Sequence, residues 1–190
     1  MKKILLLLLA LSFSIPFACL ATTISSVTVS ALANQSQLVF DGEVQSVEAF
    51  WRDERIHTRV TFSVLEVVAG DYEKKSIELI FAGGTKDGKR FSVGAEIPKM
   101  GERGIYFVES LEVPLLNPLY GWSQGHFVIE NGQVYAADRA PVVQVEPTTK
   151  TTDLISDNVA DGIYTTKRAP SIRVLTVDEF KSQIRGLTID

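Results

Sequence analysis

The most regular feature of the sequence is an alternation of apolar and polar residues that fills the region from residue 38 to residue 70. Phe40 and Val44 occupy one phase of the alternation, whereas Val47 and Trp51 occupy the other. Alternation of this kind is typical of a strand with one buried face, and a change of phase within it indicates a β-bulge. We therefore predict a long, bulged first strand whose register slips near Gln45-Ser46.

Further strands are expected along the next hundred residues, separated by short polar or glycine-rich turns. They are expected over residues 58–70, 77–81, 90–93, 104–109, 125–130, 133–136 and 142–145. Asn131-Gly132 lies between two of these runs and is a strong hairpin signal. Residues 104–109 are apolar on both faces, which favours a central position in the sheet.

Two short helices are expected outside the strands. Ser30 is a candidate N-cap for one or two helical turns within residues 29–35. Thr176 is a candidate N-cap for a helix over residues 177–185, with acidic residues in its first turn and a glycine after its end.

Seven or eight strands with hairpin turns favour an all-antiparallel fold. Because the bulge and the glycine pairs are devices for curving a sheet, we predict a mainly β fold built on a small antiparallel OB-like barrel. Pro147 and the threonine-rich residues after it have the composition of a linker. We expect the barrel domain to occupy residues 22–146, and residues 147–190 to hold the linker, an irregular tail and the C-terminal helix.

The amino terminus has a different pattern from the rest of the chain. Two lysines precede about a dozen largely apolar residues, which Pro16 interrupts, and small residues then lead to Ala21. Since a membrane-spanning helix needs ~20 apolar residues, we read residues 1–21 as a secretory signal peptide that is removed. The expected location is periplasmic or secreted. In the alternative, Cys19 is the acylated first residue of a lipoprotein.

The net charge and the cysteine content limit which partners the protein can bind and how the fold can be stabilised. The formal net charge is −4, which argues against nucleic acid and against an anionic lipid surface. Cys19 is the only cysteine, so no intramolecular disulfide can form and the domain depends on burial and strand pairing. A membrane is expected as a partner only if Cys19 is lipidated. The expected partner is a protein or ligand of the cell envelope.

A series of glycine, apolar and polar positions covers roughly residues 38–129. They are Phe40-Asp41-Gly42-Glu43-Val44, Thr58, Val60, Val64, Val67, Gly70, Gly83-Gly84, Gly101-Glu102, Tyr106-Phe107, Gly121 and Gln124-Gly125-His126-Phe127. Their order and spacing resemble an uncharacterised exported bacterial domain, which in turn resembles the OB-type barrel of netrin-like modules and tissue inhibitors of metalloproteinases. The resemblance implies a barrel fold and, as an alternative function, protease inhibition. The inhibitors act through an amino-terminal cysteine in a disulfide framework, which this chain lacks.

One segment matches a catalytic motif. Gly121-Trp122-Ser123-Gln124-Gly125 fits G-x-S-x-G, in which a serine nucleophile lies on a tight turn between a strand and a helix. Here a proline-containing loop precedes the segment and a strand is predicted after it. We therefore interpret Ser123 as a loop hydroxyl, and keep a serine hydrolase that pairs Ser123 with His57 or His126 as the alternative function.

The histidines and Glu66 are the remaining candidates for ligands or catalytic groups. His57 and His126 are the only histidines, and no carboxylate stands at helical spacing to either. We expect both at exposed or rim positions, with no metal and no cofactor. Glu66 occupies an inward phase of an apolar strand, and we expect the strand to twist it outward at its end.

These observations favour an exported, non-enzymatic binding module that holds a protein or small ligand at its loop rim. The candidate binding residues are Trp51, His57, Trp122 and His126, because aromatic and imidazole side chains suit a partly exposed contact surface. No catalytic residue is predicted.

Overall fold

The computed structural model describes residues 25–94, 96–147, 159–165 and 173–188. The predicted signal peptide, Cys19 and the threonine-rich part of the linker lie outside the described residues. The elements in chain order are α2 (Val29–Gln35), β1 (Leu38–Arg52), β2 (Arg55–Ala69), β3 (Ser76–Ala82), β4 (Gly84–Lys86), β5 (Lys89–Phe91), β6 (Arg103–Val108), the 3-10 helix η1 (Trp122–Gly125), β7 (His126–Glu130), β8 (Gln133–Ala136), β9 (Val142–Val145), β10 (Ile163–Thr165) and α3 (Val177–Arg185).

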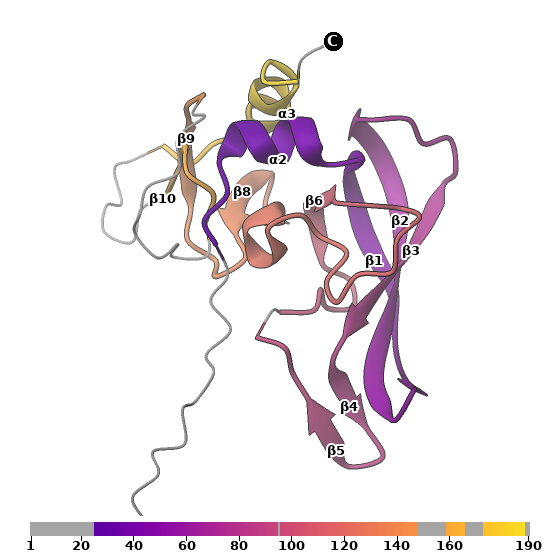
Figure 1. The fold of residues 1–190 in the computed structure, drawn as a ribbon. Coiled ribbons are helices and arrows are strands. Elements are labelled where there is room, and N and C mark those ends of the chain that lie inside the picture. Colours follow the sequence, from indigo (N-terminus) through magenta and orange to yellow (C-terminus); the bar gives the residue numbers. More distant parts are fainter. Residues whose placement is uncertain (1–24, 95, 148–158, 166–172, 189–190) are drawn as a thin grey trace, which may run out of the picture.

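The fold is mainly β and centres on one antiparallel sheet of six strands in the order β3-β2-β1-β6-β7-β8 (Figure 1). β6 lies in the middle of this sheet, as its two apolar faces predict. Two small hairpin-like pairs, β4-β5 and β9-β10, complete the strands. Within the described residues the end strands β3 and β8 do not pair with each other, so the sheet is open there.

The predicted bulge in the first strand is confirmed. The register between β1 and β2 shifts between Val44 and Ser46, and it shifts again between Asp41 and Gly42. Each irregularity leaves an extra residue on one strand and increases the local twist. The long β1-β2 pair therefore bends, and its far end lies beside the β4-β5 hairpin (Figure 1).

Each face of the sheet buries its own hydrophobic cluster because successive side chains on a strand point to opposite faces. Val39 and Phe107 belong to the cluster under the helices, where Phe180 and Ile184 of α3 and Leu32 of α2 are fully buried. The opposite cluster is rich in aromatic rings. Its members are Leu38, Phe40, Val44, Val60, Phe62, Ile77, Leu79, Phe81, Tyr106, Val108 and Leu119. The C-terminal helix thus belongs to the same core as the sheet.

Several local expectations are confirmed and others need correction. Helix α3 has the predicted bounds and begins at a capping box between Thr176 and Glu179. Helix α2 is also present, but its N-cap is Thr28 rather than Ser30, since the Thr28 hydroxyl accepts the Ala31 N–H. The strand predicted near residues 90–93 is the second half of the β4-β5 hairpin. The tail also contributes β10, which pairs with β9 and was not expected from the sequence.

Candidate functional site

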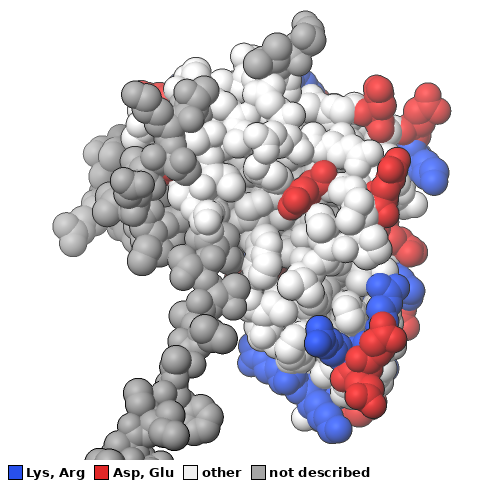
Figure 2. Space-filling view, viewed as in Figure 1, with Lys and Arg blue, Asp and Glu red and all other residues white. Residues whose placement is uncertain are grey.

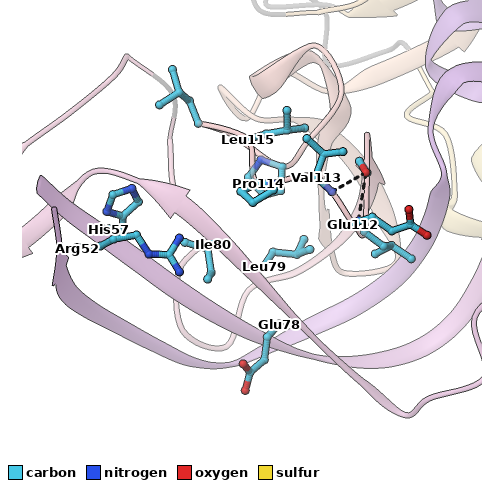
Figure 3. A pocket seen from close by; sticks show the side chains of 13 residues that line it. Arg52, His57, Glu78, Leu79, Ile80, Glu112, Val113, Pro114 and Leu115 are labelled. Carbon is cyan, nitrogen blue, oxygen red and sulfur yellow. Dashed lines mark hydrogen bonds between the residues drawn. The ribbon is translucent and has the colours of Figure 1, made fainter.

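A groove of about 390 Å³ lies between strand β3 and the loop that connects β6 to η1. Figure 3 shows its lining side chains, with Leu79 and Ile80 on the strand and Val113, Pro114 and Leu115 on the loop. The loop wall of the groove is exposed to solvent, so it is available to a partner.

The loop that forms one wall is held at both ends by hydrogen bonds. The Leu111 N–H donates to Gln37 Oε1 over 2.7 Å. The Ala82 N–H, at the end of β3, donates to the Leu116 carbonyl over 2.7 Å. Between them, the Ser110 hydroxyl accepts the Val113 N–H. These bonds fix the loop in the free protein, which lowers the ordering cost of binding.

The loop exposes three large apolar side chains within six residues. Leu111, Val113 and Leu116 are 37%, 59% and 54% exposed. Figure 2 shows that charged side chains gather along the margins of the face in view and leave its centre largely uncharged. A cluster of exposed apolar residues beside a groove is typical of an interaction surface.

The polar side chains that line the groove are Arg52, His57, Glu78, Ser110 and Glu112. Arg52 and His57 lie together at one end, and Glu112 lies at the other (Figure 3). The His57 ring packs against Phe50 in a tilted arrangement with ring centroids 5.9 Å apart, and its Nδ1 atom is buried without a hydrogen-bond partner in the described part of the chain. Arg52 also lies over the Phe50 ring, at 5.7 Å. This end of the groove therefore offers an exposed cation, Arg52, to a partner.

The four residues predicted as binding residues do not form one site. His57 lines the groove. Trp51, on the same hairpin, is 41% exposed and donates its indole N–H to Asp87 on the β4-β5 turn. Trp122 lies half-buried in η1, and His126 begins β7. His126 is only 3% exposed, so the expectation of an exposed or rim position is wrong for this residue.

His126 belongs to a buried polar cluster beneath the aromatic face. Its Nε2 atom lies 2.8 Å from Glu102 Oε1, and Arg139 donates to the other Glu102 oxygen over 2.8 Å. Its ring stacks on Tyr106, with centroids 5.1 Å apart. Burial opposes ionisation of Glu102, but the hydrogen bond from His126 and the electrostatic attraction of His126, Arg139 and Lys99 together outweigh it and lower the pKa of this carboxyl. The imidazole and carboxylate are shielded from solvent, which suits a structural role.

A second buried charge cluster joins α3 to the sheet, and Glu66 is the only member with an unusual position in the sequence pattern. Asp41 is fully buried, and Arg103 donates two hydrogen bonds of 3.0 and 2.8 Å to its carboxylate. Lys181 Nζ lies 2.5 Å from Asp41 Oδ2 and 2.7 Å from Glu66 Oε2. Arg185 pairs with the same Glu66. Glu66 is therefore positioned by two cations of α3, rather than by strand twist alone.

The G-x-S-x-G segment forms η1 and leads directly into β7. The helix that a nucleophile elbow requires after its serine is replaced by this strand. Gln124 within the segment is buried, where its amide oxygen accepts the Val27 N–H and its amide nitrogen donates to the Ser25 carbonyl. The segment thus anchors the start of the described chain to the sheet.

Comparison of the chain with protein-family models, with curated proteins and with solved structures finds no match in any of the three. Among the described residues, no helix has the length and apolar character needed to cross a bilayer. In the same residues, no three side chains of His, Cys, Asp or Glu gather as a metal site would require.

Proposed function

We propose that this protein is an exported, non-enzymatic binding module that holds a protein or small ligand in the groove between β3 and the loop of residues 110–118. The observation that carries the proposal is the groove itself, with a fixed loop and three exposed aliphatic side chains along one wall. When a partner covers apolar surface of this kind, its removal from water makes the free energy of binding more favourable. His57 is the candidate binding residue that contributes to this groove.

A photo-cross-linking amino acid at Val113 tests the binding proposal in cells. Val113 and Leu65 are both well exposed, but only Val113 lines the groove. We expect a discrete adduct from Val113 and none from the matched probe at Leu65. Equal adducts from both positions, or adducts from neither, would contradict binding at the groove.

Export is proposed on the sequence pattern of residues 1–21. Mass determination of the mature protein tests it. We expect an amino terminus at Thr22. An acylated Cys19 would instead make the protein a lipoprotein, and retention of Met1 or its neighbours would exclude cleavage of a signal peptide.

A relationship to the OB-type barrel of netrin-like modules is also proposed. The bulged and bent β1-β2 pair supports it, because barrels curve their strands with bulges at corresponding places. An experimental structure in which further strands close the sheet would support the barrel. The same structure with β3 and β8 at two free edges would exclude it.

A further inference from the structure

Strand β3 presents an open edge beside the groove. In an antiparallel pair, successive residues direct their backbone groups alternately toward the neighbouring strand and away from it. The Gly83 N–H donates to the Ile56 carbonyl of β2 over 2.8 Å, which sets this alternation at the end of β3. It follows that Glu78 and Ile80 direct their N–H and C=O groups away from β2.

The protein already uses this edge at one position. The outward N–H of Ala82 donates to the Leu116 carbonyl, so the loop pairs with the sheet there as a strand would. At Glu78 and Ile80, no residue in the described part of the chain takes the outward groups. Unpaired edge groups of this kind are a template for an added strand.

The apolar wall of the groove lies where the side chains of an added strand would fall. Leu79 is on the face of β3 that the loop covers, and both line the groove (Figure 3). A residue opposite Leu79 on an added strand would point to the same face of the sheet. Its side chain would therefore meet the exposed Leu111 and Val113.

Charge at one end of the groove specifies the partner further. Arg52 is exposed, and no carboxylate pairs with it within the described ranges. The His57 ring lies beside it, with its Nδ1 atom buried. An acidic side chain at this end would gain a charge-assisted hydrogen bond from the exposed Arg52.

We propose that β3 binds an extended segment of a partner protein as an added strand, in which apolar residues alternate with polar ones and an Asp or Glu lies beside Arg52 and His57. This rests on the proposed function and names its partner class. Backbone hydrogen bonds at Glu78 and Ile80 supply the affinity, and the apolar wall and the basic end supply the specificity.

The test is selection from a random dodecapeptide display library on the immobilised protein, followed by affinity measurement with the enriched peptides. We expect alternating apolar peptides that contain an acidic residue. Ile80→Pro removes the outward N–H without removing a bond to β2, and proline is tolerated on an edge strand in this orientation. This variant should lose at least tenfold in affinity, whereas Ile80→Val, which keeps the N–H, should lose less than threefold.

The pair Val113→Ser and Ile80→Pro separates the two proposals. If only Val113→Ser weakens binding, the groove binds a partner but strand addition is wrong. If neither variant weakens binding, or if no peptide is enriched, both binding at the groove and strand addition to β3 are wrong. Circular dichroism checks the folding of Ile80→Pro. If Ile80→Pro unfolds, Arg52→Ala is used instead. Arg52→Ala should lower the affinity for acidic peptides about tenfold. It should not lower the affinity for peptides with Asn or Gln in place of the acidic residue.

A second copy of the chain is the competing occupant of the edge. Analytical ultracentrifugation distinguishes it from a partner peptide. We expect a monomer in the wild type and in Ile80→Pro. A dimer that Ile80→Pro dissociates would show that β3 pairs with itself, and this result would overturn the proposal of a partner segment.

Discussion

Asp41 is the most deeply buried charged residue in the described part of the chain. Its carboxylate is fully buried between the Arg103 guanidinium and the Lys181 ammonium. A buried carboxylate without partners would be strongly unfavourable, and removing its charge leaves the two cations facing each other. The cluster thus makes the position of α3 depend on one side chain of β1.

Asp41→Asn is expected to lower the free energy of unfolding by about 3 kcal/mol, because it breaks a buried ion pair while leaving the cations in place. Urea denaturation measures this change. The control is Glu48→Gln, which removes an exposed pair with Arg59 and should cost less than about 1 kcal/mol. Equal losses of unfolding free energy in the two variants would show that the buried ion pairs of Asp41 stabilise the fold no more than an exposed pair does.

The free energy of unfolding should also depend on pH through Asp41. Burial favours the neutral form of Asp41, but the hydrogen bonds and the electrostatic attraction of Arg103 and Lys181 together outweigh it and lower the folded-state pKa. The stabilisation is therefore complete above the unfolded pKa of about 3.9 and is lost as the pH falls through the lower folded value. Urea midpoints between pH 7 and pH 3 should fall less steeply for Asp41→Asn than for the wild type. Parallel curves would contradict this assignment.

Tyr106 offers the opposite case, a buried polar group that gains no partner. Its hydroxyl has no hydrogen bond within the described structure, and burial raises the pKa of the phenol. Tyr106→Phe removes this hydroxyl and keeps the ring that stacks on His126. We expect the free energy of unfolding to rise by about 1 kcal/mol. A decrease of that size would show that the hydroxyl stabilises the fold.

At the scale of elements, the sequence predicts those helices, turns and bulges that a local residue pattern determines. The β1 bulge followed from a phase change, the β7-β8 hairpin from Asn131-Gly132, and α3 from its cap. The groove could not be predicted in this way, because its loop has no periodicity and its position depends on a long-range bond from Ala82. The Asp41 cluster escaped prediction for a similar reason, since its cations lie far away in the sequence.

Helix α3 gives an element-scale prediction. Its capping box satisfies backbone N–H groups that would otherwise have no partner, with Thr176 accepting the Glu179 N–H and Glu179 accepting the Thr176 N–H. Thr176→Ala should cost about 1 kcal/mol in urea denaturation. Ser182→Ala, at an exposed position inside the same helix, is the control and should change stability by less than about 0.5 kcal/mol. A capping role would be contradicted by equal effects.

For the whole molecule, the shared core predicts cooperative unfolding. α2, α3, β9 and β10 bury their apolar residues in one cluster with the central strands. Separate melting of α3 would expose Phe180 and Ile184 and uncover the Asp41 cluster. Native-state hydrogen exchange should therefore give the amides of α3 nearly the same free energy of opening as those of β1. Markedly faster exchange in α3 would show that the C-terminal helix is an independent unit.

The pairing of Asp41 with Lys181 also bears on how the chain folds. The two residues are separated by most of the polypeptide, and contacts between such distant segments slow folding because a large loop must close first. A chain delivered amino terminus first presents β1, β2 and Arg103 well before Lys181. Until Lys181 arrives, the buried carboxylate of Asp41 has only one of its two cations and the sheet lacks the apolar cover of α3. We therefore expect the sheet to reach its final order only after α3 has been synthesised and has packed against it.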